Sequence, residues 1–169
     1  MFSSVTARTA GFNTTDTASL TDGSKLLTII LMFIGGSPGS TAGGIKTTTI
    51  FVLLMCVHSN IKQTYGVNIF GRRLEENVIK RAGAILTINL FLALSASLAI
   101  MAIQPLGFSD ILFETASAIG TVGMTTGITR DLYPVSRVII IILMYSGRIG
   151  SLSFALAFAR ASGRLMWNK

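Results

Sequence analysis

The sequence contains few of the charged residues that cover the surface of a soluble domain. Only 12% of its 169 residues are charged, whereas 50% are hydrophobic, and the mean hydropathy is +0.66. A single cysteine, Cys56, excludes an intrachain disulfide and a metal cluster held by several thiolates. The lone His58 lies near a predicted helix end, where we expect a solvated or interfacial residue. These scarcities predict a membrane protein.

The net charge of +7 is unevenly distributed. Eight of the 14 basic residues fall in the polar segment 59–81 or at the C-terminus, namely Lys62, Arg72, Arg73, Lys80, Arg81, Arg160, Arg164 and Lys169. Five acids lie on the opposite side of the predicted spans, namely Asp16, Asp22, Asp110, Glu114 and Asp131. The positive-inside rule therefore places the basic segments in the cytoplasm, and the outer acids would concentrate cations. This distribution explains the basic balance without a nucleic-acid surface.

A short helix, a small-residue turn and a long apolar run succeed one another in the C-terminal part. Residues 109–119 predict an amphipathic helix with Ser109 as its N-cap and Asp110 in its first turn. This helix is about half as long as a bilayer crossing, which takes roughly 20 residues. Gly120-Thr121-Val122-Gly123-Met124 then leads into a crossing over 134–158. The order is typical of a re-entrant pore loop, and Thr-Val-Gly is the centre of the potassium-filter sequence.

The filter-like sequence has an earlier counterpart. Thr9-Ala10-Gly11-Phe12 repeats the order of small polar, small, Gly and large apolar residues, 112 positions before Thr121-Val122-Gly123-Met124. The same offset relates Thr14 to Thr126, and Gly35 to Gly147, which we expect to interrupt the last helix. Coincidence in a Gly-rich membrane protein is the alternative. The matched positions favour an internal repeat of the kind found in transporters.

One predicted span is interrupted by glycines. The apolar run 26–34 meets the Gly-rich segment 35–44, whose glycines and proline cannot continue a helix. We expect helicity to resume at Ile45 and to continue to His58. Discontinuous helices of this kind mark ion pathways in transporters. A polar loop over 59–79 and an uninterrupted span over 82–103 follow.

Lys46 and Arg148 are the two cations inside predicted spans, where each needs a carbonyl, carboxylate or water partner. Lys46 either acts on the ion path beside the Gly-rich segment or extends to the cytoplasmic interface. Arg148 is placed to pair with loop carbonyls, or with a helix C-terminus at a subunit contact. Glu114 has two interpretations that stay open, a charge at a pore mouth or the polar face of the short helix.

Enzymatic interpretations are less favoured. The segment around Lys46 does not form a phosphate-binding loop, because Ile45 separates the preceding glycine from the lysine. Ser37 or Ser40 with Lys46 could form a nucleophile pair, as in membrane serine proteases. No residues indicate a substrate groove or an oxyanion hole. An intramembrane protease and a non-conducting assembly subunit remain the alternatives to a transporter.

Residues 5–14, residues 35–46, and residues 120–126 with Gly147 and Arg148 together resemble the Ktr/Trk/HKT cation-transporter superfamily, above all its bacterial KtrB-type potassium transporter subunits. The resemblance covers the whole chain. It implies an all-α membrane protein of helix–pore-loop–helix repeats, with re-entrant pore helices, filter strands and one broken transmembrane helix. Residues 1–79 would be a partial third unit and residues 80–169 the complete fourth.

The resemblance also implies roles for individual residues. The selectivity filter would consist of Thr9, Ala10, Gly11, Phe12, Thr121, Val122, Gly123 and Met124. K⁺ would bind at the carbonyls of Thr9, Ala10, Gly11, Thr121, Val122 and Gly123. The gating loop would consist of Gly35, Gly36, Ser37, Pro38, Gly39, Ser40, Thr41, Ala42, Gly43 and Gly44. Lys46 would follow this loop, and Arg148 would face it or a dimer contact. A filter Gly resembles potassium-conducting members, whereas a Ser there is associated with sodium preference.

The partners that the resemblance implies are the lipid bilayer, a second copy of the chain, and a cytoplasmic ring of nucleotide-binding regulatory subunits. Segment 59–81 and the C-terminal tail would dock on that ring. We expect a multi-pass protein of the bacterial plasma membrane with a cytoplasmic C-terminus, no covalent cofactor and K⁺ as the transported ion. Two filter strands cannot surround an ion. The chain is therefore expected to be half of a pore-forming subunit, a fragment or a truncated product that does not conduct alone.

Overall fold

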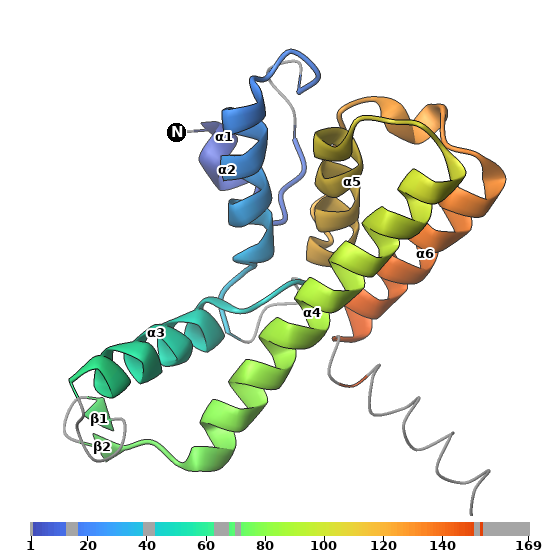
Figure 1. Cartoon of the computed structure of the whole chain (residues 1–169). Helices are drawn as coiled ribbons and strands as arrows, with labels where there is room; N and C mark the ends of the chain where they lie inside the picture. Colours follow the sequence, from blue (N-terminus) through green and yellow to red (C-terminus); the bar gives the residue numbers. More distant parts are fainter. Residues whose placement is uncertain are drawn as a thin grey trace, which may run out of the picture.

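The described part of the chain is mainly helical in its computed structural model, which describes residues 2–12, 17–38, 43–62, 68–69, 72–150 and 153 (Figure 1). The elements are α1 Phe2–Thr6, α2 Asp22–Phe33, α3 Thr47–Ile61, β1 Asn68–Ile69, β2 Arg72–Arg73, α4 Glu76–Ile103, α5 Phe108–Gly120, η1 Ile128–Arg130 and α6 Pro134–Ile149. The all-α class expected from the sequence is confirmed. The short antiparallel hairpin of β1 and β2, which pairs Ile69 with Arg72, lies where only a polar loop was expected.

Helix α4 is the longest element and carries the clearest membrane signal. Within the described residues it is the one helix that is both long and apolar enough to cross a bilayer, while α3 is apolar but shorter. Its 28 residues extend for about 42 Å, more than the roughly 30 Å of a hydrocarbon core. It begins six residues before the predicted start, because Glu76 in its first turn and Lys80 one turn later extend the helix into the polar region.

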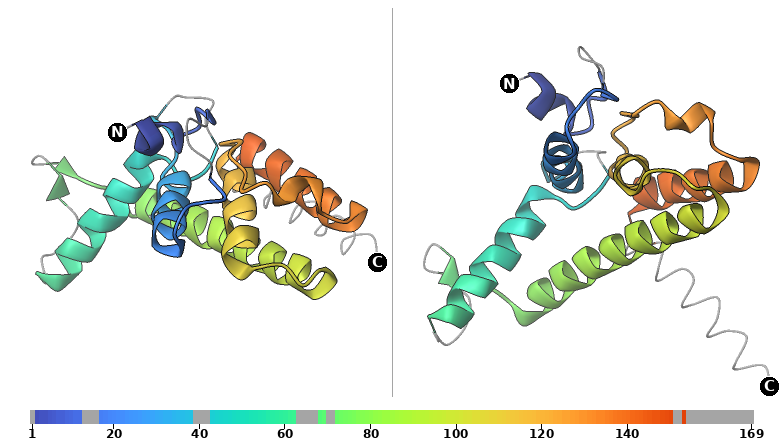
Figure 2. Two further views of the ribbon diagram at one scale, coloured as in Figure 1. Left: turned by 90° about the horizontal axis from the view of Figure 1, so that it is seen from above. Right: turned by 45° about the horizontal axis from the view of Figure 1, so that its top comes forward.

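Helix α5 lies at the centre of the described structure. Figure 2 shows it between α2 on one side and α4 with α6 on the other. Its residues from Phe113 to Gly120 are all buried, although the segment contains Glu114, Thr115 and Ser117. Small side chains at Ala116 and Ala118 let the neighbouring helices approach closely. A helix about half a bilayer long is thus enclosed by protein rather than by lipid.

The predicted break between α2 and α3 is present, and its two ends are joined. Ile34 and Ile45 form an isolated parallel β-bridge. The Gly35 amide donates to the Ile45 carbonyl at 2.8 Å, and the Ile45 amide donates to the Phe33 carbonyl at 3.0 Å. Because Ile45 is used in this bridge, α3 begins at Thr47 and the predicted resumption at Ile45 is wrong by two residues. Figure 1 shows α2 and α3 running in different directions from the bridge.

Helix α6 ends earlier than the predicted crossing over 134–158. The last helical residue of the element is Ile149, and Gly150 follows with a φ of +94°. Gly147, expected to interrupt the helix, lies inside α6 instead. It is buried, and a Cβ atom at this position would overlap the carbonyl oxygen of Ile119 in α5. The glycine therefore permits a close helix contact and does not end the helix. Apart from Ser153, the rest of the predicted crossing lies outside the described residues.

Candidate functional site

The two filter-like segments lie side by side although 112 positions separate them. A Cβ atom on Gly11 would overlap the carbonyl oxygen of Val122 and would lie 3.8 Å from the Cα atom of Gly123. The two backbones therefore touch at corresponding positions of the sequence repeat. Phe12 is 71% exposed, and Ala10 and Gly123 are exposed as well.

The two segments share an unusual backbone. Thr9 and Thr121 have φ angles of +69° and +54° and are the non-glycine residues with positive φ in the described part of the chain. Gly11 and Gly123 follow with +72° and +85°. A left-handed conformation is uncommon for a β-branched residue, and each instance costs about 1–3 kcal/mol that the surroundings must offset. The conformation recurs at the same offset as the sequence pattern. Regular β geometry, expected here as filter strands, is absent from both segments as described.

The C-terminal end of α5 explains the conformation of Thr121. The Val122 amide donates to the Ser117 carbonyl at 3.0 Å, and the Thr121 amide donates to the Ala118 carbonyl at 3.2 Å. This is the hydrogen-bond pattern of a Schellman cap, which needs a left-handed residue and normally uses glycine. At the other end of α5 the N-cap is Gly107 and not the predicted Ser109, whereas Asp110 does lie in the first turn.

Part of the Gly-rich segment contacts the second filter-like segment. The Gly43 amide donates to the side-chain oxygen of Thr121 at 2.9 Å. A Cβ atom on Gly43 would lie 2.7 Å from that same side chain, so a larger residue would not fit there. Gly44, with a φ of +72°, lies against the Cα atom of Gly120. Gly39, Ser40, Thr41 and Ala42 lie outside the described residues.

The two cations expected inside spans lie at helix ends. Lys46 is the half-buried N-cap residue of α3. Arg148 lies exposed in the last turn of α6, where a positive charge is favoured by the free carbonyls of the helix end. The structure therefore places neither side chain deep in the protein. Ser37, one candidate nucleophile, is exposed.

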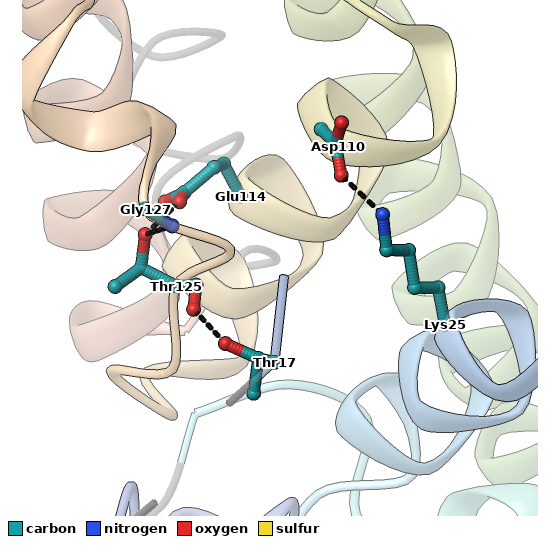
Figure 3. Close-up of polar contacts among 6 residues, drawn as sticks. All are labelled: Thr17, Lys25, Asp110, Glu114, Thr125 and Gly127. Atoms are coloured by element: carbon teal, nitrogen blue, oxygen red, sulfur yellow. Dashed lines mark hydrogen bonds and ion pairs between the residues drawn. The ribbon is translucent and has the colours of Figure 1, made fainter. Parts of the chain in front are cut away.

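Glu114 is buried and faces the segment that follows the second filter-like segment (Figure 3). It is 6% exposed, and its carboxylate accepts hydrogen bonds from the hydroxyl groups of Thr125 and of Thr129, the latter at 3.0 Å. The Gly127 amide donates to the Thr125 hydroxyl oxygen at 2.9 Å. This burial does not fit the interpretation of Glu114 as part of a solvated polar face of the short helix.

A second contact between the two repeats, an ion pair, was not predicted from the sequence. Lys25 in α2 and Asp110 in α5 form an ion pair of 2.8 Å, and their side chains are 10% and 27% exposed. Figure 3 shows the lysine reaching across to the first turn of α5. Asp110 is one of the acids expected to attract cations, and Lys25 balances its charge. Asp22 and Asp131 are exposed, while Asp16 lies outside the described residues.

Comparisons with known proteins place this geometry in a family context. The family model described as "Cation transport protein", TrkH, matches residues 1–167. The chain is 41% identical over 159 residues to the Ktr system potassium uptake protein B of Bacillus subtilis, covering 94% of this chain and 36% of that protein. It is 40% identical over 153 residues to the potassium/sodium uptake protein NtpJ of Enterococcus hirae, covering 88% of this chain and 34% of that protein.

A solved structure has the same fold. The potassium transporter TrkH from Vibrio parahaemolyticus superposes with a TM-score of 0.69 at 23% identity, over 85% of this chain and 32% of that one. The chain thus spans about a third of the length of the proteins it matches. These relatives are named as transporters and not as enzymes, so they do not favour the protease alternative. The chain belongs to the TrkH family of membrane cation transport proteins.

Proposed function

We propose that this chain contributes two filter segments and the adjoining gate to a potassium-transport pore. The observation that carries the proposal is the direct contact of Gly11 with Val122, between two segments that share a left-handed Thr and a left-handed Gly at the same offset. Relatives at 41% and 36% identity are named potassium uptake proteins, and one at 40% is named for potassium and sodium. Those names motivate K⁺ as the transported ion.

The mechanism rests on backbone carbonyls. In a regular strand successive carbonyls point to opposite sides. Positive φ at every second residue, as at Thr9 and Gly11 and again at Thr121 and Gly123, allows successive carbonyls to turn toward one side. In the proposal the carbonyls of these residues, with those of Ala10 and Val122, replace the hydration shell of K⁺. Phe12 and Met124 end the two segments. The Phe12 carbonyl accepts a hydrogen bond from the Thr6 hydroxyl at 2.7 Å, which fixes the end of the first one.

The proposed assembly completes this half pore. Residues 1–79 would form part of a third pore unit and residues 80–169 a fourth, and further units of the same subunit would close the ring. The filter side would face outward and the C-terminus the cytoplasm. A homodimer on a cytoplasmic nucleotide-binding ring, contacted by segment 59–81, is part of the same proposal.

The proposed gate is the Gly-rich segment 35–44. The bridge between Ile34 and Ile45 fixes its two ends, and the Gly43–Thr121 hydrogen bond holds it against the filter. An ion leaving the filter would then meet this segment next. Lys46 and Arg148, at the ends of α3 and α6, would supply positive charge on the inner side of the gate.

The filter assignment is tested by Gly123→Ser. We would measure K⁺ and Na⁺ uptake in a potassium-uptake-deficient bacterium by a full-length chimera, in which this chain replaces the matching segment of the Bacillus subtilis relative. A Cβ atom on Gly123 meets nothing within 4 Å, so the variant should fold despite a strain of about 1–2 kcal/mol. We expect the preference for K⁺ over Na⁺ to fall about tenfold, a change of about 1.4 kcal/mol.

The matched control is Gly150→Ser. Gly150 also has positive φ and open space around its Cβ position, but lies at the end of α6 and outside the filter. It should leave ion preference unchanged. Equal ion preference in Gly123→Ser and Gly150→Ser would refute the filter assignment.

The gate is tested by shortening segment 35–44 in the same chimera, with Gly35 and Gly43 through Ile45 retained so that the bridge and the Thr121 contact remain. A shorter segment should obstruct the inner path less, and we expect a several-fold higher maximal K⁺ uptake at unchanged ion preference. Uptake equal to that of the parent chimera would show that segment 35–44 is not the gate.

A further inference from the structure

A cavity of about 530 Å³ adjoins the second filter segment. Its lining combines apolar side chains with one carboxylate and one guanidinium, those of Glu114 and Arg130. Gly123, Met124 and Thr125 form the wall toward the filter. The filter backbone therefore borders a cavity here, and a further interaction can add to the α5 cap and the Gly43 hydrogen bond in holding its shape.

The hydrogen bonds of Glu114 supply that interaction. Thr125 directly follows the filter, and its hydroxyl donates to Glu114 while accepting from the Gly127 amide. Thr129 donates to the same carboxylate oxygen from the next turn. The Thr125 carbonyl in turn accepts from the hydroxyl of Thr17, a buried residue of the first repeat (Figure 3). A continuous chain of polar contacts thus runs from α5 through the end of one filter segment to the segment that follows the other.

We propose that Glu114 is a positioning residue that fixes the filter geometry through Thr125 and Thr129 and thereby sets its discrimination between K⁺ and Na⁺. This inference rests on the proposed function. The left-handed conformation of Thr121 is strained and persists only where its surroundings hold it, whereas Gly123 adopts it without strain. Hydrogen bonds to an ionised carboxylate are about twice as strong as neutral ones, and they gain further in a site shielded from water. Without them the carbonyl spacing relaxes, and a filter of relaxed spacing accommodates Na⁺ as well as K⁺.

The decisive variant is Glu114→Gln in the full-length chimera. The amide keeps the shape of the side chain and one acceptor oxygen but loses the charge. We expect the K⁺-over-Na⁺ uptake ratio to fall about fivefold to tenfold while K⁺ uptake itself continues. Thr125→Val should reproduce this loss, and Thr125→Ser, which retains the hydroxyl, should restore the parent ratio.

Thr115→Val is the matched control. Thr115 is a buried hydroxyl residue on the same helix, but its partner is Ser97 in α4 at 2.9 Å. The loss of this hydrogen bond should lower the thermal stability of the purified protein and leave the K⁺-over-Na⁺ uptake ratio unchanged. A general loss of packing would instead lower the ratio in Thr115→Val as well, and that result would overturn the inference.

Two further outcomes separate this inference from the proposed function. A parent chimera that selects K⁺, with Glu114→Gln and Thr125→Val selecting it equally well, would overturn the role of Glu114 alone. The second readout is the midpoint of thermal unfolding of purified protein in K⁺ and in Na⁺, which requires no transport. A parent protein that shows neither uptake nor greater stabilisation by K⁺ would overturn the proposed function, and this inference with it.

Discussion

Gly11 occupies a position that no other residue fits, for two independent reasons. Its φ of +72° costs an alanine about 1–2 kcal/mol, and a Cβ atom would overlap the Val122 carbonyl, which belongs to the backbone and cannot rotate away. We expect Gly11→Ala to abolish K⁺ uptake by the chimera and to lower its unfolding free energy by more than about 2 kcal/mol.

The control for this substitution is Gly23→Ala in the first turn of α2. Nothing lies within 4 Å of its Cβ position, and an alanine in a helix is favoured over glycine by about 0.5–1 kcal/mol. K⁺ uptake should persist in Gly23→Ala. Thermal unfolding of the two purified variants should show a loss of stability in Gly11→Ala and none in Gly23→Ala. An active, stable Gly11→Ala protein would contradict the close contact of the two filter segments.

At the residue scale, the sequence predicted residues that belong to a short repeated motif, but not contacts between residues far apart in the chain. Thr9 and Thr121 were found through a repeated tetrapeptide, and their shared left-handed conformation agrees with that repeat. The ion pair of Lys25 with Asp110 joins residues 85 positions apart, so no periodicity could have revealed it. Glu114 could be recognised as an acid on a short helix, but its threonine partners depend on how the chain turns back after the filter.

At the scale of elements, α5 and α6 approach closely at one glycine. A Cβ atom on Gly147 would overlap the carbonyl oxygen of Ile119 and lie 3.0 Å from the adjoining carbon. We expect Gly147→Ala to push the two helices apart, to cost about 1–3 kcal/mol of stability and to reduce K⁺ uptake. Thermal unfolding and uptake of the chimera measure both effects.

Gly83 provides the matching helical glycine. It lies in α4 with nothing within 4 Å of its Cβ position, so Gly83→Ala should stabilise the protein by about 0.5–1 kcal/mol and leave uptake intact. If both alanine variants behaved alike, the close helix contact at Gly147 would be disproved.

Element identities were more predictable than element ends. Glycines and a proline marked the break after α2 correctly, because those residues cannot continue a helix. The bridge between Ile34 and Ile45 was not predictable, since it pairs residues on either side of the break. The prediction that Gly147 interrupts the last helix was wrong for a related reason. A sequence does not distinguish a glycine that ends a helix from one that lets a neighbouring helix approach closely.

At the scale of the whole molecule, the two proposed filter segments touch at Gly11 and Val122. Phe12 and Gly123 are exposed, and an ion held by these two segments alone would keep part of its water. We therefore expect no rescue of a potassium-uptake-deficient strain by this chain alone. Co-expression with the upstream part of the Bacillus subtilis relative should rescue growth on low potassium. Rescue by the chain alone would mean that copies of this chain close the pore together.

The enclosure of α5 has an electrostatic consequence for the proposed pore. Thr121 follows directly on the C-terminal end of this helix. The aligned peptide dipoles of a helix place about half a negative elementary charge at that end. Because α2, α4 and α6 surround α5, dissolved salt screens this partial charge poorly. It also has no proton to gain or lose, and it remains when Lys25 neutralises Asp110. The pore would therefore hold a permanent attraction for cations that acidification and high ionic strength leave largely intact.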